Sequence, residues 1–205
     1  MVGSSPNRLV VGILEACCRQ LWGFPPRMIP YILRRMGTAR GLWWFIVNMP
    51  RYLSTLHALG PLRTHLACVA VSLHNGCVYC SFGHTFAIEL LYFRERNRLF
   101  PLDRHVLSEW IDLEPRQLSA QLHRVLQEAG LHAEAIWVDR ALALASGSIQ
   151  PVDRTEARLA RLVQIISRMN EVAIAYGVAP DEAHDTINKD VALKERYATV
   201  RAGVA

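Results

Sequence analysis

The sequence predicts an all-α protein, and three observations support this class. Apolar residues recur at intervals of three and four along most of the chain, which is the spacing of one face of an α-helix. Proline and glycine stand mainly between these segments, where helices begin or end. No segment alternates apolar and polar residues in the manner of a half-buried strand. With 205 residues, 51% hydrophobic and 20% charged, the chain is long enough to form one domain with a sizeable core, and a disordered protein is excluded.

The first predicted helix begins at Ser5 and Pro6, because serine caps helices and proline fits their first turn. It ends near Gly23. Its apolar stripe is broad, so we expect it to dock on the rest of the fold or on a partner subunit. Cys17 and Cys18 are adjacent within it, and we interpret both as residues that fill the core.

Residues 26–50 are interrupted by prolines and glycines, so only short helices are expected there. Residues 42–47 form the most hydrophobic run of the chain. Because this run lacks a basic face, we expect it in the core or at a subunit interface and not on a membrane surface. Pro50 is predicted to separate it from a short amphipathic helix that ends at Gly60.

The rest of the chain shows a series of amphipathic patterns bounded by proline, glycine or a capping residue. They predict helices over residues 61–74, 77–93, 103–113, 115–129, 131–145 and 153–177. The last stretch, residues 180–200, is helix-prone but sparsely apolar. We expect it to form a peripheral helix or an arm that docks on a partner.

Two cysteines and a histidine are the candidate site. Cys77, Cys80 and His84 occupy positions i, i+3 and i+7, which lie on one face of a helix. Asn75 and Gly76 indicate the end of the preceding helix, so Cys77 should lie at the start of the next one. Free N–H groups and the helix dipole there stabilise a thiolate, which predicts a redox dithiol. Binding of zinc by Cys77, Cys80 and His84, or simple core packing, are the alternatives.

The net charge and the number of cysteines limit the expected partners and the expected cellular compartment. The net charge is +5, but the basic residues are scattered, so no nucleic-acid partner is expected. Five cysteines are too few for a secreted disulfide framework and favour a reducing compartment. There is no signal-peptide pattern and no apolar stretch of membrane-spanning length. We therefore expect a cytoplasmic protein that does not interact with membranes.

Four segments of the chain form an ordered motif: residues 49–53, residues 66–73, the Asn-Gly-Cys-x-Tyr-Cys turn at 75–80, and the His-Thr pair at 84–85. In this order the chain resembles the alkylhydroperoxidase D (AhpD)-like family of the carboxymuconolactone decarboxylase superfamily. The likeness is firmest over residues 50–89. It divides the chain into an N-terminal helical extension (1–45), an AhpD-like helical domain (46–178) and a C-terminal helical arm (179–205).

The resemblance implies a thiol peroxidase that forms a trimer-based homo-oligomer and needs no cofactor. It implies a hydroperoxide or disulfide substrate and an external dithiol reductant. Cys80 would be the peroxidatic cysteine, Cys77 the resolving cysteine, and His84 part of a proton relay. A zinc-binding protein, or a helical assembly protein with vestigial cysteines, is the alternative.

One position departs from the family pattern. The family carries a glutamate twelve residues before the first cysteine of the motif, where this chain has His65. A helix hairpin that turns at Gly76 would bring His65 and Cys68 back beside the motif. We therefore expect His65 close to His84, either as part of the relay or as a buried neighbour. If both imidazoles lie together, one should be neutral near pH 7.

Overall fold

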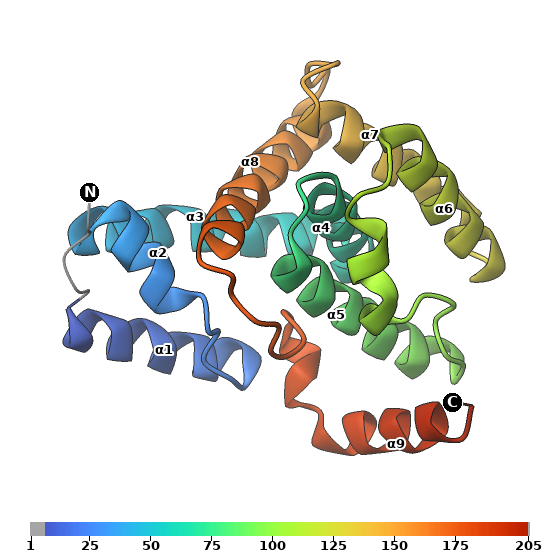
Figure 1. The fold of residues 1–205 in the computed structure, drawn as a ribbon, viewed down its shortest axis with the longest axis horizontal. Helices are drawn as coiled ribbons and strands as arrows, with labels where there is room; N and C mark the ends of the chain where they lie inside the picture. The colour runs from blue at the N-terminus through green and yellow to red at the C-terminus, as the bar shows by residue number, and fades with distance from the viewer. Residues whose placement is uncertain (1–6, 205) are drawn as a thin grey trace.

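The computed structural model describes residues 7–204, and these residues fold into α-helices and short 3-10 helices without a strand (Figure 1). This confirms the predicted all-α class. None of the helices in this part of the chain is both long and apolar enough to cross a membrane. The elements are α1 (Arg8–Trp22), α2 (Ile29–Met36), α3 (Thr38–Leu59), α4 (Pro61–His74), α5 (Val78–Arg96), η1 (Arg104–Trp110), α6 (Pro115–Glu128), η2 (His132–Glu134), α7 (Ala135–Ala145), α8 (Arg154–Ala175), η3 (Thr186–Lys189) and α9 (Val191–Ala202).

The hairpin of α4 and α5 forms the centre of the fold (Figure 1). Both helices are buried on almost every side, which explains why their sequences are apolar around most of the helix and not along one stripe. Helices α7 and α8 pack on α4, and η1 and α9 pack on α5. Helix α3 packs on α8 and α4, and α2 packs on α3, so the N-terminal helices cover one side of the hairpin.

Helix α1 ends where the sequence predicted. Gly23 has a φ of 83°, the left-handed conformation that terminates helices, and its N–H bonds to the carbonyl of Arg19. The predicted start at Ser5 and Pro6 lies outside the described residues. In the described part, Asn7 caps the helix by accepting a hydrogen bond from the N–H of Leu9 at 2.9 Å.

The predicted break at Pro50 is wrong, because α3 continues through it. Proline removes the N–H that would bond to the carbonyl of Ile46. Ile46 lies on the exposed side of the helix, with 56% of its surface accessible, so solvent can satisfy that carbonyl. The hydrophobic run before Pro50 is split between two environments: Phe45 is buried, whereas Trp43 is 67% exposed.

The α-helix predicted over residues 103–113 is also wrong, because the structure has the 3-10 helix η1 there. The backbone N–H of Arg104 donates to the buried carboxylate of Glu89 at 3.0 Å, and the Arg104 guanidinium pairs with the same carboxylate. Asp103 accepts a hydrogen bond from the N–H of His105. These side-chain contacts cap the first turn of η1.

The segment after α8 differs most from the prediction. Residues 178–190 are not a peripheral helix; they run back over α5 and toward α1, and much of the segment is buried. Ala183, His184 and Asp185 are at most 5% exposed. Only α9, which follows, has the helical structure expected of residues 180–200. This segment supplies side chains to the site described next.

Candidate functional site

Cys77 and Cys80 lie where the α4–α5 turn ends, as predicted. Gly76 closes the turn with a φ of 77°, and Cys77 is the N-cap residue of α5. The sulfur of Cys77 accepts a hydrogen bond from the backbone N–H of Cys80 at 3.4 Å. Both thiols are buried, with 1% and 0% of the two residues exposed. The first N–H groups of an α-helix have no carbonyl partner within the helix, and here one of them is directed at a cysteine sulfur.

The two thiols differ in acidity. Hydrogen bonding from Cys80 lowers the pKa of Cys77, although burial opposes it. Burial raises the pKa of Cys80 well above its ordinary value, and the adjacent Cys77 raises it further. The negative charge of a singly ionised pair therefore lies on Cys77. This differs from the role that the family resemblance implies, in which Cys80 is the thiolate that reacts first.

The other cysteines have different surroundings. Cys68 is fully buried in α4, and burial raises its pKa well above the ordinary value. Burial also raises the pKa of Cys18 to about 12. Cys17 is exposed, so its interpretation as a core residue was wrong, because adjacent positions on a helix point in different directions. Among the five cysteines, Cys17 is therefore the one whose thiol solvent reaches most easily.

His65 and His84 are in contact, as predicted, and a carboxylate completes a chain of three groups. The two Nδ1 atoms are 3.0 Å apart, and Nε2 of His65 is 2.9 Å from Oδ2 of Asp185. An ionised Asp185 accepts the Nε2 proton of His65. If His65 is neutral, its Nδ1 must then accept the Nδ1 proton of His84, which leaves Nε2 of His84 as a free base. If Nε2 of His84 takes up a proton, the Nδ1 proton can pass to His65, beside the carboxylate.

Burial lowers the pKa of His84 well below its ordinary value, and the positive charges of His184 and His65 lower it further. Burial raises the pKa of Asp185, but the hydrogen bond and the charge of His65 outweigh it and leave that pKa below the ordinary value. His84 is therefore neutral near pH 7 and Asp185 is ionised. This matches the expectation that at least one of two adjacent imidazoles is neutral.

A second carboxylate–imidazole pair lies beside the first. Nε2 of His184 is 3.1 Å from Oδ1 of Asp181, whose other oxygen accepts a hydrogen bond from the hydroxyl of Tyr79 at 2.9 Å. The His184 ring stands at 90° to the His84 ring, with the centroids 5.2 Å apart. Its backbone N–H donates to the carbonyl of Gly83. A Cβ atom at Gly83 would lie 2.5 Å from this ring, so only glycine lets the segment approach α5 so closely.

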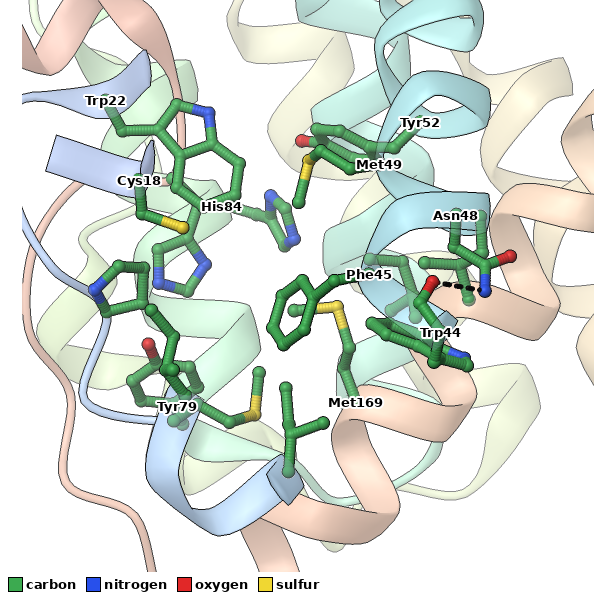
Figure 2. A pocket seen from close by; sticks show the side chains of 17 residues that line it. Cys18, Trp22, Trp44, Phe45, Asn48, Met49, Tyr52, Tyr79, His84 and Met169 are labelled. Carbon is green, nitrogen blue, oxygen red and sulfur yellow. Dashed lines mark hydrogen bonds between the residues drawn. The ribbon is translucent and has the colours of Figure 1, made fainter. Parts of the chain in front are cut away.

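His84 also lines a narrow, mostly apolar cavity of about 40 Å³ (Figure 2). Trp22 and Cys18 line one side, and Phe45 and Trp44 line another (Figure 2). The wall combines side chains from α1, α2, α3, α5 and α8 with His184. Neither Cys77 nor Cys80 is among the lining residues. The N-terminal helices thus cover His84 with a hydrophobic chamber, while the two thiols lie outside its wall.

The structure brings all four predicted site residues into the α4–α5 hairpin, but not as a metal centre. Within residues 7–204, no three His, Cys, Asp or Glu side chains converge as ligands for a metal ion. The alternative ligand set of Cys77, Cys80 and His84 is therefore not assembled. Nδ1 of His84 faces His65 instead.

Sequence reasoning missed Asp181, His184 and Asp185. The signal available for them is weak: three carboxylates and a histidine occur within five residues, in a stretch where the apolar periodicity ends after Gly177. Polar, potentially reactive side chains in a connecting segment are a general indication of function. Nothing in that pattern indicates which helix the segment packs against.

We compared the chain with protein families, curated proteins and solved structures. No family model matches it, and no curated protein and no solved structure matches it. The similarity to the AhpD-like family stays a prediction from the motif residues.

Proposed function

We propose that this protein is a dithiol oxidoreductase of the thiol-peroxidase type, in which Cys77 and Cys80 alternate between a dithiol and a disulfide. One observation carries the proposal: Cys77 caps α5, and its sulfur accepts the N–H of Cys80. This geometry favours a thiolate at one cysteine and keeps the second thiol one helical turn away. A dithiol in this position is typical of redox-active CxxC motifs.

In the proposed reaction the Cys77 thiolate attacks one oxygen of a hydroperoxide. An S–O bond forms, the O–O bond breaks, and the alkoxide leaves as an alcohol after taking a proton. Cys77 is then a sulfenic acid. The Cys80 sulfur attacks the Cys77 sulfur, a disulfide forms, and hydroxide leaves as water with the proton from Cys80. An external dithiol returns two electrons and two protons by thiol–disulfide exchange.

In this proposal, the chain of Asp185, His65 and His84 acts as the base that removes the proton of Cys80, whose pKa is raised. Burial disfavours the Cys80 thiolate, so attack on the sulfenic acid needs a base. His84 follows Cys80 by one helical turn in α5, a spacing at which side chains are neighbours. His84 and His65, in line with Asp185, can hold the proton taken from Cys80 until the leaving hydroxide accepts it and departs as water.

The turn around Cys77 supports an encounter with an external dithiol. Asn75 and Gly76 are partly exposed and Val78 is 37% exposed, so only a thin layer covers Cys77. Cys80 lies one turn deeper. The cysteine with the lowered pKa is thus the one nearer the surface, which is the order expected when a disulfide must be opened by a partner from outside.

Trapping the sulfenic acid tests the proposal. In a Cys17→Ser background, which removes the exposed thiol, reduced protein is treated with one equivalent of cumene hydroperoxide. We expect a Cys77–Cys80 disulfide by peptide mapping, and its reversal by dithiothreitol. With Cys80→Ser added, a dimedone adduct should form on Cys77. With Cys77→Ser added, adduct formation on Cys80 should be slower by roughly tenfold or more, as expected for a suppressed thiolate.

Two results would contradict parts of the proposal. If both thiols stay free after stoichiometric peroxide, while iodoacetamide modifies them in unfolded protein, the peroxidase function is refuted. If Cys80 forms the faster adduct, the dithiol chemistry stands but the order of the cysteines is that of the AhpD-like family.

We further propose that the chain forms a homo-oligomer, as the family resemblance implies. Trp43 and Ile46 lie one turn apart on α3 and are 67% and 56% exposed. On α1, Leu9 and Ile13 are 71% and 51% exposed. Apolar side chains this exposed and spaced along one helix face are typical of surfaces that a second copy covers.

A further inference from the structure

The positive charge of this chain is concentrated in its N-terminal part. Residues 1–60 contain seven arginines and one acidic residue, Glu15, whereas residues 61–205 contain 16 basic and 17 acidic residues. The net charge of +5 therefore comes from the segment that contains α1, α2 and α3. In sequence order these arginines are scattered, but the fold brings two of them, Arg35 and Arg40, to one surface groove.

The groove lies between α2, α3 and α8 and has a volume of about 370 Å³. Three exposed arginines line it: Arg35 from α2, Arg40 from α3 and Arg168 from α8. Its other lining residues are half-buried except for an exposed tryptophan, and they are Met36, Trp43, Trp44, Val47 and Asn48. An arginine rim thus surrounds a mostly aromatic and apolar floor.

The protein does not neutralise the charge of this rim. No acidic side chain is among the described lining residues, and neither Arg35 nor Arg40 forms an ion pair within residues 7–204. Arg168 pairs with Glu171 at 2.6 Å, but the two side chains are 49% and 57% exposed. An ion pair this exposed contributes little to stability, so Arg168 can turn toward another anion at small cost. Three guanidinium groups around one groove give it a positive potential.

The combination of arginine and tryptophan defines the chemistry of the ligand. A guanidinium group binds phosphate oxygens through paired N–H donors. A phosphate monoester is largely dianionic at pH 7 and has three terminal oxygens, so it can accept from several arginines, which suits this rim better than a singly charged carboxylate does. Tryptophan rings bind planar groups by stacking. The volume of about 370 Å³ lies in the range of small-molecule sites.

We propose that the groove binds a small phosphorylated molecule that carries a planar ring, of the nucleoside monophosphate class. The phosphate accepts hydrogen bonds from the arginines of the rim. The ring lies against the tryptophan side chains of α3.

The groove is distinct from the sites described above. None of Cys77, Cys80 and His84 lines it, so the proposal does not depend on the redox function. Of the two exposed apolar side chains on α3 that are assigned to the oligomer, Trp43 lines the groove and Ile46 does not. The groove therefore borders the oligomer surface and is not identical with it.

Adenosine monophosphate, adenosine and ribose 5-phosphate separate the contributions of the phosphate and the ring. Each is titrated into the full chain at pH 7 under reducing conditions, and binding is measured by isothermal titration calorimetry. We expect adenosine monophosphate to bind roughly tenfold or more tightly than adenosine, which lacks the phosphate. It should bind roughly fivefold or more tightly than ribose 5-phosphate, which lacks the stacking ring. Vesicles of phosphatidylglycerol and phosphatidylcholine present phosphate as a lipid headgroup, and we expect no co-sedimentation with them.

Arg40→Gln and Arg51→Gln form a matched pair of variants. Both arginines are exposed residues of α3 without an ion pair in the described chain, but Arg51 does not line the groove. Arg40→Gln should weaken the binding of adenosine monophosphate roughly threefold to tenfold and leave that of adenosine unchanged. Arg51→Gln should leave both affinities unchanged. Far-UV circular dichroism checks that both variants are folded.

Several outcomes would overturn the inference. They are no binding of adenosine monophosphate in the millimolar range, or equal affinities for adenosine monophosphate and adenosine. Equal weakening by Arg40→Gln and Arg51→Gln would show a general effect of net charge and no site. Equal affinities for adenosine monophosphate and ribose 5-phosphate would refute the contact with the ring. Binding to the vesicles without binding of adenosine monophosphate would assign the arginines to a membrane surface instead.

Discussion

Asp185→Asn tests the chain of groups that connects Asp185 to His84. The amide oxygen of asparagine can still accept the Nε2 proton of His65, which lies 2.9 Å from the carboxylate. The substitution therefore keeps the volume and the hydrogen bond but removes the negative charge. A proton on His65 then has no counter-ion in a site where the His65 side chain is completely buried. The variant isolates the electrostatic contribution of Asp185 from its packing.

The magnitudes follow from the burial of this pair. A hydrogen bond to a charged group contributes about 1.5–3 kcal/mol to stability, against about 0.5–1.5 kcal/mol for a neutral one. Asp185→Asn should thus lower the free energy of unfolding at pH 7 by about 1–2 kcal/mol. If His84 must pass its proton to His65, the rate of disulfide formation from the sulfenic acid should fall by roughly a hundredfold, the usual effect of losing an acid–base partner.

The stability difference should depend on pH in one direction. Burial raises the pKa of Asp185, but the hydrogen bond and charge of His65 leave it below the ordinary value of 3.8. The unfolded chain therefore binds this proton more readily than the folded chain does. The stabilisation by Asp185 is complete above pH 3.8 and is lost as the pH falls through the lower, folded-state pKa. The gap between wild type and Asp185→Asn should close on acidification.

Asp181→Asn is the matched control. Asp181 lies in the same segment and pairs with His184 at 3.1 Å, but it does not contact His65. Denaturant unfolding from pH 7 to pH 3 measures stability, and quenched alkylation with mass spectrometry measures disulfide formation. Both variants should lose stability, whereas only Asp185→Asn should slow the disulfide step. Equal rates in wild type and Asp185→Asn, with a clear loss of stability, would show that the histidine chain is structural.

Two further predictions concern packing and assembly. Gly83→Ala should lower the free energy of unfolding by about 1–3 kcal/mol, because the new Cβ would lie 2.5 Å from the His184 ring; Gly12→Ala, with no atom within 4 Å of its Cβ inside α1, should be neutral or stabilising in the same urea titration. Trp43→Lys should shift the mass measured by light scattering toward the monomer, because it places a charge on the exposed face of α3. A monomeric wild type at micromolar concentration would contradict the proposed oligomer.

Local signals explain what the sequence could predict. Asp153 caps α8 by accepting from the N–H of Glu156, and Gly76 and Gly177 end or follow helices with positive φ. Each of these features depends on one or two residues and their neighbours in the chain. The position of Cys77 at the start of α5 is of the same kind. The contact of His65 with His84 could be predicted because a short turn joins their two helices.

The wrong predictions at Pro50 and at residues 103–113 concern positions whose structure depends on the rest of the fold. Pro50 is compatible with a continuous α3 because the carbonyl it leaves unpaired belongs to the exposed Ile46. Residues 103–113 have an amphipathic pattern, yet the structure has a 3-10 helix there, and its first residue, Arg104, is held by the buried Glu89 through its backbone N–H and its guanidinium. Neither solvent access at one carbonyl nor a carboxylate 15 residues away can be read from local periodicity.

Asp185 shows both the use and the limit of the family resemblance. The family pattern places a carboxylate at position 65, and from the sequence His65 could be either part of the relay or a buried neighbour. The structure has a carboxylate against His65, one imidazole further from His84, and it comes from a residue 120 positions later. A motif comparison limited to the α4–α5 hairpin has no access to this residue, because the segment that carries it has no helical pattern. The histidine at position 65 is thus coupled to the path of residues 178–190, which bring Asp185 to it. The resulting chain of Asp185, His65 and His84 ends at a residue of the cavity wall. Nε2 of His84 has no hydrogen-bond partner among the described residues.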